Sequence, residues 1–224
     1  MRIGGLQKFS LIDYPGKMAA IVFTQGCNFR CGYCHNPQLV CPGRFHAPIE
    51  ESVVLGFLGS RQGKLQGVVV TGGEPTIQKG LADFLAKLKA MGYAVKLDTN
   101  GSNPGVLACV INARLVDFIA MDIKTSLVRY EEAVGVKPDI EAIKSSVQLV
   151  LQSGLRHQFR TTLVKSHCSR EDLEDIQGLI GPSRYYALQS FTPSANIIDP
   201  GLLDRDRYDQ KDTQELRMQF QRGF

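Results

Sequence analysis

The 224-residue sequence predicts one α/β domain that folds as an open, partial (β/α)6 barrel, an incomplete TIM-like barrel with a short N-terminal extension. Short apolar runs alternate with segments of helical period six times along the chain. This alternation indicates a parallel sheet with right-handed crossovers. Six βα units are two short of a closed eight-stranded barrel, so we expect the sheet to remain open.

The first half of the chain supplies three of the six expected units. Residues 1–17 carry turn signals and are expected to form a small extension or hairpin that precedes a barrel over residues 18–193. Proline and acidic residues suit the first turn of a helix, and apolar residues at a spacing of three and four indicate an amphipathic helix. The expected strands are 18–24, 67–71 and 93–99, and the expected helices are 48–58 and 77–91.

The second half repeats the pattern and ends in a polar tail. Ser169 is expected to cap a helix, with Asp172 completing a capping box. The tail, residues 201–224, is rich in charges such as those of Asp204 and Arg205, and should form a polar surface helix or a partly disordered segment. The expected strands are 116–123, 157–164 and 184–191, and the expected helices are 104–112, 139–153 and 169–180.

Composition and charge exclude several classes of protein. The net charge of +4 is spread along the chain without a run of like charges, so it does not indicate nucleic-acid binding. No signal peptide and no apolar stretch long enough to span a membrane is apparent, so we expect a cytoplasmic protein. Six cysteines in a cytoplasmic chain of this length indicate metal binding or reduced thiols rather than a disulfide framework.

Three closely spaced cysteines are the most informative feature. Cys27, Cys31 and Cys34 form the pattern C-x3-C-x2-C directly after the first expected strand. Thiolates of this kind hold a [4Fe–4S] cluster, and three of them would leave one iron open to a small molecule. Zinc is the alternative, with His35 as a fourth ligand, and plain reduced thiols are the simplest alternative. Cys41 as a fourth cluster ligand would block the open iron.

The remaining cysteines carry less information. Cys109 lies in an apolar helical stretch and is expected to belong to the core, and Cys168 is far from the motif in sequence.

Polar residues follow the other expected strands at their carboxyl ends. In a parallel barrel these ends share one rim, which is where active sites lie. Considered one at a time, these residues have ordinary interpretations. The glycines could form a simple turn, the carboxylates could cap helices or form surface ion pairs, and the lysine could be a solvated side chain. Their convergence with the cysteines indicates a common site. The residues are Gly72, Gly73, Glu74, Asp98, Thr99, Asp122, Lys124 and Gln189.

Several motifs in this chain resemble those of one enzyme family. The three cysteines, with Tyr33 before the last, resemble the signature of the radical S-adenosylmethionine (SAM) superfamily. The stretches Ser10-Leu-Ile-Asp-Tyr-Pro-Gly-Lys17 and Cys34-His-Asn-Pro37 resemble glycyl-radical-enzyme activases, most closely the activating proteins of anaerobic ribonucleoside-triphosphate reductases. The similarity runs to about Pro200. It implies a [4Fe–4S] cluster and SAM as cofactors and the same open barrel.

The resemblance also implies roles for the glycine motif and the two carboxylates. Gly72, Gly73 and Glu74 match the motif that binds the SAM amino group. Asp98 and Asp122, with Thr99, match residues that flank the SAM ribose and carboxylate and can hold a monovalent cation with the carbonyl of Ala120.

Further SAM contacts are implied elsewhere. Lys124 would neutralise the SAM carboxylate. Tyr33 and His35 would lie against the adenine, although plain packing is an equal alternative for Tyr33. Gln189 would contact SAM where some activases carry a histidine, and Arg160 is either a residue of the barrel interior or a structural arginine.

By resemblance, the chain cleaves SAM reductively and the resulting radical abstracts a glycine Cα hydrogen from an anaerobic ribonucleotide reductase. A flavodoxin- or ferredoxin-type protein would supply the electron. The alternatives are another glycyl-radical enzyme of the formate-lyase type, a small-molecule substrate, or a non-enzymatic zinc-binding adaptor. No cysteine-rich insertion follows Cys34, which makes the dehydratase activases a poorer match.

Overall fold

The computed structural model describes the chain except for residues 182, 184, 195, 203–205 and 224. The start of the expected strand 184–191 and the charges of Asp204 and Arg205 therefore lie outside the described residues.

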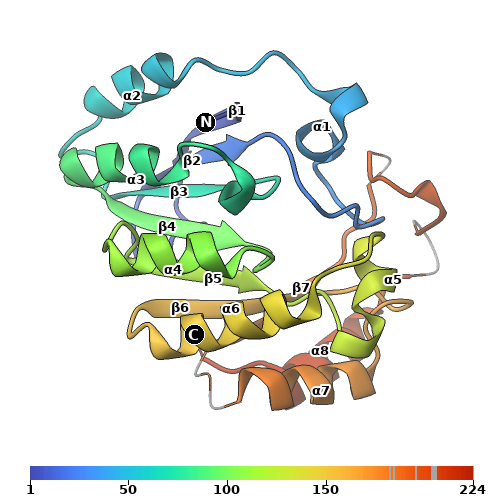
Figure 1. Cartoon of the computed structure of the whole chain (residues 1–224). Helices are drawn as coiled ribbons and strands as arrows, with labels where there is room; N and C mark the ends of the chain where they lie inside the picture. The colour runs from blue at the N-terminus through green and yellow to red at the C-terminus, as the bar shows by residue number, and fades with distance from the viewer. Residues whose placement is uncertain (182, 184, 195, 203–205, 224) are drawn as a thin grey trace. The chain divides into compact units, whose positions relative to one another are not determined.

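Figure 1 labels the helices and strands along the chain. The strands are β1 Ile3–Ser10, β2 Ala19–Thr24, β3 Gly67–Gly72, β4 Ala94–Thr99, β5 Phe118–Asp122, β6 Arg156–Leu163 and β7 Tyr186–Ser190. The α-helices are α1 Pro37–Val40, α2 Glu51–Gly59, α3 Leu81–Ala90, α4 Pro104–Asn112, α5 Tyr130–Val134, α6 Ile140–Gln152, α7 Arg170–Ile180 and α8 Gln210–Phe220. The 3-10 helices are η1 Pro42–Arg44, η2 Pro75–Ile77, η3 Leu127–Arg129 and η4 Pro200–Leu202.

The strands follow one another in chain order, β1-β2-β3-β4-β5-β6-β7, in a seven-stranded sheet with β1 and β7 at the two ends of the order. The pairs β2–β3, β3–β4 and β6–β7 are parallel, whereas β1 runs antiparallel to β2. The predicted α/β class, with a mostly parallel and unclosed sheet, is confirmed.

The described residues form two compact units. One contains Met1–Asn28, Gln38–Thr99 and Gly105–Ile119. The other contains Phe29–Pro37, Asn100–Pro104 and Ala120–Phe224. The chain passes from the first unit to the second inside the cysteine motif, because Cys27 belongs to the first and Cys31 and Cys34 belong to the second.

The first unit begins with a strand, β1, that pairs with β2. Residues 1–17 were expected to form a small extension or hairpin, and Ile3–Ser10 adds an antiparallel strand to the sheet by pairing with β2. The strands β2, β3 and β4 that follow are almost entirely buried, which explains the continuous apolar runs of β2 and β3. Helix α3 begins at Leu81, later than expected, because Gly80 has a φ of +81° and cannot continue a right-handed helix from η2.

Helix α4 matches its expected bounds, but its cysteine does not lie in the core. Leu107 and Val110 form the buried face, whereas Cys109 is exposed. The expectation of a core position for Cys109 was wrong, because an apolar helix on the surface of a sheet still buries only one stripe of side chains.

The second unit contains β6, β7 and the helices α5 to α8. The capping box predicted for α7 is confirmed, since the Ser169 hydroxyl accepts from the Asp172 amide and the Asp172 carboxylate accepts from the Ser169 amide. Helix α8 contacts α7 and β7, and buries Leu216 and Phe220. The tail therefore forms a helix with one apolar, packed face rather than a purely polar surface segment.

None of the helices in the described residues is long and apolar enough to cross a membrane.

Candidate active site

The three cysteines of the motif form no disulfide within the described structure. Cys31 is buried, whereas Cys27 and Cys34 are partly exposed. Across the described residues, no group of three His, Cys, Asp or Glu side chains is arranged closely enough to hold a metal ion.

In the first unit, the glycines of the Gly-Gly-Glu motif bring the end of β3 against the residues that precede Cys27. Gly72 has a φ of +115°, and a Cβ atom there would lie 2.4 Å from the Thr24 amide nitrogen. A Cβ atom on Gly73 would lie 2.0 Å from the Gly26 carbonyl oxygen. The Gly73 amide donates to the Thr24 carbonyl (2.9 Å), and the Glu74 amide donates to the Gly26 carbonyl (2.8 Å). The glycines thus permit a close approach of the chain to itself, directly before Cys27.

Glu74, the third residue of the motif, is almost completely buried. One carboxylate oxygen, Oε1, accepts from the Thr76 amide (3.0 Å), the Thr76 hydroxyl (2.6 Å) and the Thr99 hydroxyl (2.7 Å). The Glu74 residue is 1% exposed, so these donors replace water around the charge of its carboxylate. Glu74 therefore joins the ends of β3 and β4, and Thr99, which was predicted as a ligand contact, is its hydrogen-bond partner.

Replacing Glu74 with alanine is expected to lower the free energy of unfolding by about 3 kcal/mol, because hydrogen bonds to charged groups contribute roughly 1.5–3 kcal/mol and the buried threonine donors lose their acceptor. Urea denaturation of the full chain measures this loss. Glu141→Ala is the control, since Glu141 makes only an exposed pair with Lys144. Equal midpoints for the two variants would contradict a structural role for Glu74.

Asp98 lies at the end of β4, as the sequence predicts, but its charge is paired within the unit. Lys96, which is 2% exposed, donates to the Asp98 carboxylate and lies with its ammonium 5.9 Å from the centre of the Phe118 ring. The two side chains point to the same face because they are two residues apart on a strand.

In the second unit, Cys31 and Cys34 belong to one tight turn. The Cys34 amide donates to the Cys31 carbonyl over 3.0 Å. Burial raises the pKa of the Cys31 thiol, an effect that the cation of Lys124 partly offsets. Tyr33, which lies between these two cysteines in the sequence, is buried. Burial raises the pKa of its hydroxyl well above the usual range. The raised pKa means that the Cys31 thiol keeps its proton near neutral pH when no metal is bound.

Two cations surround the carboxylate of Asp122 at the end of β5. Arg160 donates from Nε to Oδ1 (2.7 Å) and Lys124 donates from Nζ to Oδ2 (3.1 Å). Burial alone would raise the pKa of Asp122, but these two cations outweigh it and hold the pKa well below its ordinary value. Burial also opposes the charge of Lys124, and the Asp122 carboxylate more than compensates, so the pKa of Lys124 is raised.

This cluster bears on two of the expected roles. Arg160, for which the sequence allows either a place in the barrel interior or a structural role, is an ion-pair partner of Asp122. Both carboxylate oxygens of Asp122 accept from cationic side chains, and a monovalent cation held with this carboxylate stays a prediction.

Two further predicted adenine or SAM contacts of the second unit, His35 and Gln189, differ in their surroundings. His35 is exposed, its Nε2 lies 2.6 Å from the Thr192 carbonyl, and its ring centre is 5.7 Å from that of Phe191. Gln189 is exposed on β7, where it is paired in register with Thr162. His35 therefore connects the cysteine turn with the segment that follows β7.

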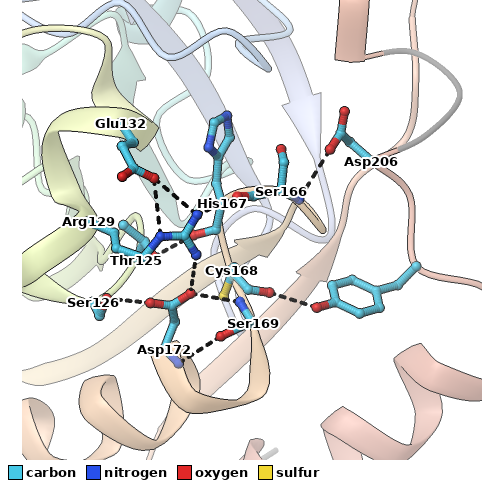
Figure 2. A network of polar contacts seen from close by, with 11 residues as sticks. Thr125, Ser126, Arg129, Glu132, Ser166, His167, Cys168, Ser169, Asp172 and Asp206 are labelled. Carbon is cyan, nitrogen blue, oxygen red and sulfur yellow. Dashed lines mark hydrogen bonds and ion pairs between the residues drawn. The ribbon is translucent and has the colours of Figure 1, made fainter.

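Figure 2 shows a polar network around the loop between β6 and α7 in the second unit. The Thr125 hydroxyl donates to the His167 carbonyl, and the Ser166 amide donates to Asp206 (3.2 Å). The His167 ring lies beside Tyr33, with ring centres 6.1 Å apart, and its Nδ1 is buried without a hydrogen-bond partner among the described residues. Burial lowers the pKa of His167.

Cys168, in the same loop, predicts a dependence of stability on pH. Burial raises the pKa of its thiol to about 12. A group with a raised pKa contributes stability below its unfolded pKa of about 8.5, and that contribution is lost as pH rises through the folded value. The free energy of unfolding should therefore fall above about pH 8.5, with a slope from this group approaching about 1.4 kcal/mol per pH unit.

Urea unfolding between pH 8 and 10.5 measures this slope. Cys168→Ala should flatten the profile, whereas Cys109→Ala, which removes an exposed thiol, should leave it unchanged. Identical profiles for the wild type and Cys168→Ala would show that Cys168 does not titrate in this way.

Sequence reasoning missed several residues that support the predicted ones. Tyr130 in α5 is fully buried and its hydroxyl accepts from the Lys124 amide (3.3 Å). Thr76 completes the surroundings of Glu74, and His167 lies beside Tyr33. Only Thr76 had a signal in the sequence, as a hydroxyl two residues after Glu74 and behind a proline that favours a turn.

The donor chemistry fits the cofactors that the motif implies. Three cysteines in C-x3-C-x2-C spacing supply the soft thiolate ligands of an iron–sulfur cluster. Lys124, which is 17% exposed on its side chain, supplies a cation for a carboxylate. The close packing before Cys27 and the turn between Cys31 and Cys34 fix the backbone on both sides of the motif.

Comparison with known proteins identifies the relatives of this chain. The family model of the Radical SAM superfamily matches residues 21–179. A protein of Methanocaldococcus jannaschii, provisionally named a glycyl-radical enzyme activating enzyme, is 34% identical over 85% of this chain and 80% of its own length. The pyruvate formate-lyase-activating enzyme of Clostridium pasteurianum is 33% identical over 55% of this chain and 52% of its own length. This chain thus spans about half of that second relative.

The fold has solved counterparts. The crystal structure of Streptococcus suis SuiB bound to S-adenosylmethionine matches 89% of this chain and 47% of that protein, with a TM-score of 0.66 and 15% identity. At this identity the match establishes the fold, and it extends over both compact units of the chain.

Proposed function

Because the chain belongs to the Radical SAM superfamily, whose members use a [4Fe–4S] cluster and SAM, we propose that it activates a glycyl-radical enzyme. The observation that carries the proposal is the 34% identity, over most of both chains, to the M. jannaschii protein provisionally named an activating enzyme of this kind. The similarity to a pyruvate formate-lyase-activating enzyme points to the same class.

Cys27, Cys31 and Cys34 would hold the cluster, and the fourth iron would remain open to SAM. When bound, the cluster supplies one electron to the sulfonium of SAM, whose S–C bond then breaks. The electron comes from outside the chain, and we propose a flavodoxin- or ferredoxin-type donor. The products would be methionine and 5′-deoxyadenosine, with the hydrogen of the latter taken from a glycine Cα of the partner, which is left as a glycyl radical.

The residues of this chain would orient SAM and exclude water. Lys124 would hold the SAM carboxylate as a point charge. Asp122 pairs with the Lys124 ammonium and would keep it in place, and Arg160 pairs with the other oxygen of Asp122. Glu74 is held in position by Thr76 and Thr99, so that the glycine turn can present backbone groups to the SAM amino group. Tyr33, His35 and Gln189 would contact the rest of SAM.

The partner that we propose is an anaerobic ribonucleoside-triphosphate reductase in the cytoplasm. Support comes from the stretch between Ser10 and Lys17, which the structure forms into a defined turn. Ser10 accepts from the amides of Ile12 and Asp13 (both 3.2 Å), and the Lys17 amide donates to the Tyr14 carbonyl (3.0 Å). The matching stretch in the reductase activases is the reason for preferring this partner to a formate-lyase.

The experiment for this partner is EPR spectroscopy of the reductase after anaerobic incubation with reconstituted protein, SAM and a reductant. A glycyl-radical signal on the reductase is expected. A parallel incubation with pyruvate formate-lyase tests the alternative partner, and a signal there alone would overturn the choice of the reductase. A colourless protein that binds zinc and takes up no iron would instead indicate the non-enzymatic adaptor.

A further inference from the structure

We propose that residues 129–135, which comprise Arg129, helix α5 and Gly135, form a clamp that positions the second half of the cysteine motif together with Lys124. We call this segment the α5 clamp. The inference rests on the proposed function, since the motif is the proposed cluster site. It assigns a positioning role to residues that the sequence motifs do not contain.

The clamp contacts the motif through the backbone of Arg30, the residue before Cys31. The Arg30 amide donates to the Val134 carbonyl over 2.7 Å. Gly135, which follows α5, has a φ of +65°, and a Cβ atom there would lie 2.7 Å from the Arg30 carbonyl oxygen. Both backbone polar groups of Arg30 therefore face the end of α5, and only glycine fits at position 135.

A second contact connects the motif with Lys124. The Tyr130 ring packs edge-on against Phe29, with ring centres 6.3 Å apart and an interplanar angle of 68°. The Tyr130 hydroxyl accepts from the Lys124 amide. One fully buried side chain thus touches the motif on one side and the backbone of Lys124 on the other. A displacement of α5 would move Cys31 and Lys124 together.

Arg129 anchors the clamp to the rest of the second unit (Figure 2). Its guanidinium donates to the Asp172 carboxylate (2.8 Å) and to the Ser166 carbonyl (2.6 Å). Asp172 is itself fixed by the capping box at the start of α7. A helix of five residues is not stable by itself, so α5 depends on such anchors.

The other side of the cysteine turn is held separately. The Asp199 amide donates to the Gly32 carbonyl (2.8 Å), and a Cβ atom on Gly32 would lie 3.1 Å from Asp199 Cβ. The turn from Cys31 to Cys34 is therefore fixed on one side by the α5 clamp and on the other by the segment around Asp199.

Gly135→Ala tests the clamp, with Gly154→Ala as the matched control. Gly154 has a φ of +70°, close to that of Gly135, but no atom lies within 4 Å of its added Cβ. Both variants therefore carry the same backbone strain, and only Gly135→Ala adds the collision with Arg30. Two readouts on the full chain avoid SAM turnover: the rate of iron release from the reconstituted protein to a chelator, and the alkylation rate of Cys31 before reconstitution.

Gly135→Ala should release iron about tenfold faster than the wild type, because residues that orient ligands typically contribute 10–100-fold to metal affinity. Cys31, which is 8% exposed, should lose its protection from alkylation in the same variant. Gly154→Ala should behave as the wild type. Equal iron release and equal alkylation for Gly135→Ala and Gly154→Ala would overturn the proposal.

Arg129→Gln provides a second test if Gly135→Ala does not fold, as judged by circular dichroism. Loss of the anchor should speed iron release by about threefold, because residues that connect two sites without touching the ligand have modest effects on it. Lys144→Gln, which removes an exposed ion pair on α6, is the control and should change nothing. An unchanged rate for Arg129→Gln in a folded protein would reject the clamp. Neither test depends on SAM cleavage or on the partner, so both remain valid if the protein holds a cluster but does not activate the proposed partner. The alkylation of Cys31 needs no bound iron and remains valid even without a cluster.

Discussion

Cys27→Ala should abolish the formation of 5′-deoxyadenosine while leaving the fold in place. Before Cys27, the carbonyls of Thr24 and Gly26 accept hydrogen bonds from the backbone amides of the Gly-Gly-Glu motif. These bonds join main-chain atoms and do not need the Cys27 thiol. Loss of one of three thiolates should leave the cluster without a stable set of ligands, since protein clusters are held by cysteine thiolates. Product assay by chromatography and a circular dichroism spectrum measure both parts of the prediction.

Cys109→Ala is the control for this experiment. Cys109 is exposed on α4, outside the motif, and its replacement should leave product formation unchanged. If Cys27→Ala still produced 5′-deoxyadenosine at the rate of the control, Cys27 would not be a cluster ligand.

Gly73→Ala should lower iron content and product formation by at least about tenfold, comparable to the loss of a residue that supports metal ligands. The added Cβ atom would lie 2.0 Å from the Gly26 carbonyl oxygen and 3.1 Å from that of Leu39. Both obstacles are backbone atoms, so the main chain before Cys27 has to move. Overpacking of this kind typically also costs about 1–3 kcal/mol of stability.

Gly43→Ala is the matched control, because no atom lies within 4 Å of a Cβ atom at that position. Iron content after reconstitution, product yield and the urea midpoint should equal those of the wild type in this control. If Gly73→Ala had the iron content of the wild type, the backbone before Cys27 would tolerate the displacement. The close approach at Gly73 would then not be needed for iron binding.

Local signals in the sequence were sufficient for most of the elements. The buried strands β2 and β3 read as continuous apolar runs because both of their faces are covered. Ser169 and Asp172 predicted the start of α7, since a capping box is formed by residues three apart and needs no tertiary context. The residues at the strand ends were likewise predictable, because the parallel order follows from the alternation of strands and helices.

The features that escaped prediction depend on tertiary contacts. The sequence predicts a small extension or hairpin for residues 1–17 but not the bounds of strand β1, because its exposed half carries Gln7, Lys8 and Phe9 and the strand gains its structure by pairing with β2. Helix α5 is too short to carry a periodic signal and exists through the contacts of Arg129 and Tyr130. The sequence also could not show that Asp122 is paired with Arg160, which lies 38 residues away on β6.

The central claim is that this chain cleaves SAM reductively. The most direct measurement is the formation of 5′-deoxyadenosine and methionine by anaerobically reconstituted protein supplied with SAM and dithionite. Equal amounts of both products, dependent on reductant and on iron content, are the predicted result. If protein with a full iron complement yielded neither product, the cluster would serve structure or electron transfer, and the proposed activation of a glycyl-radical enzyme would be contradicted.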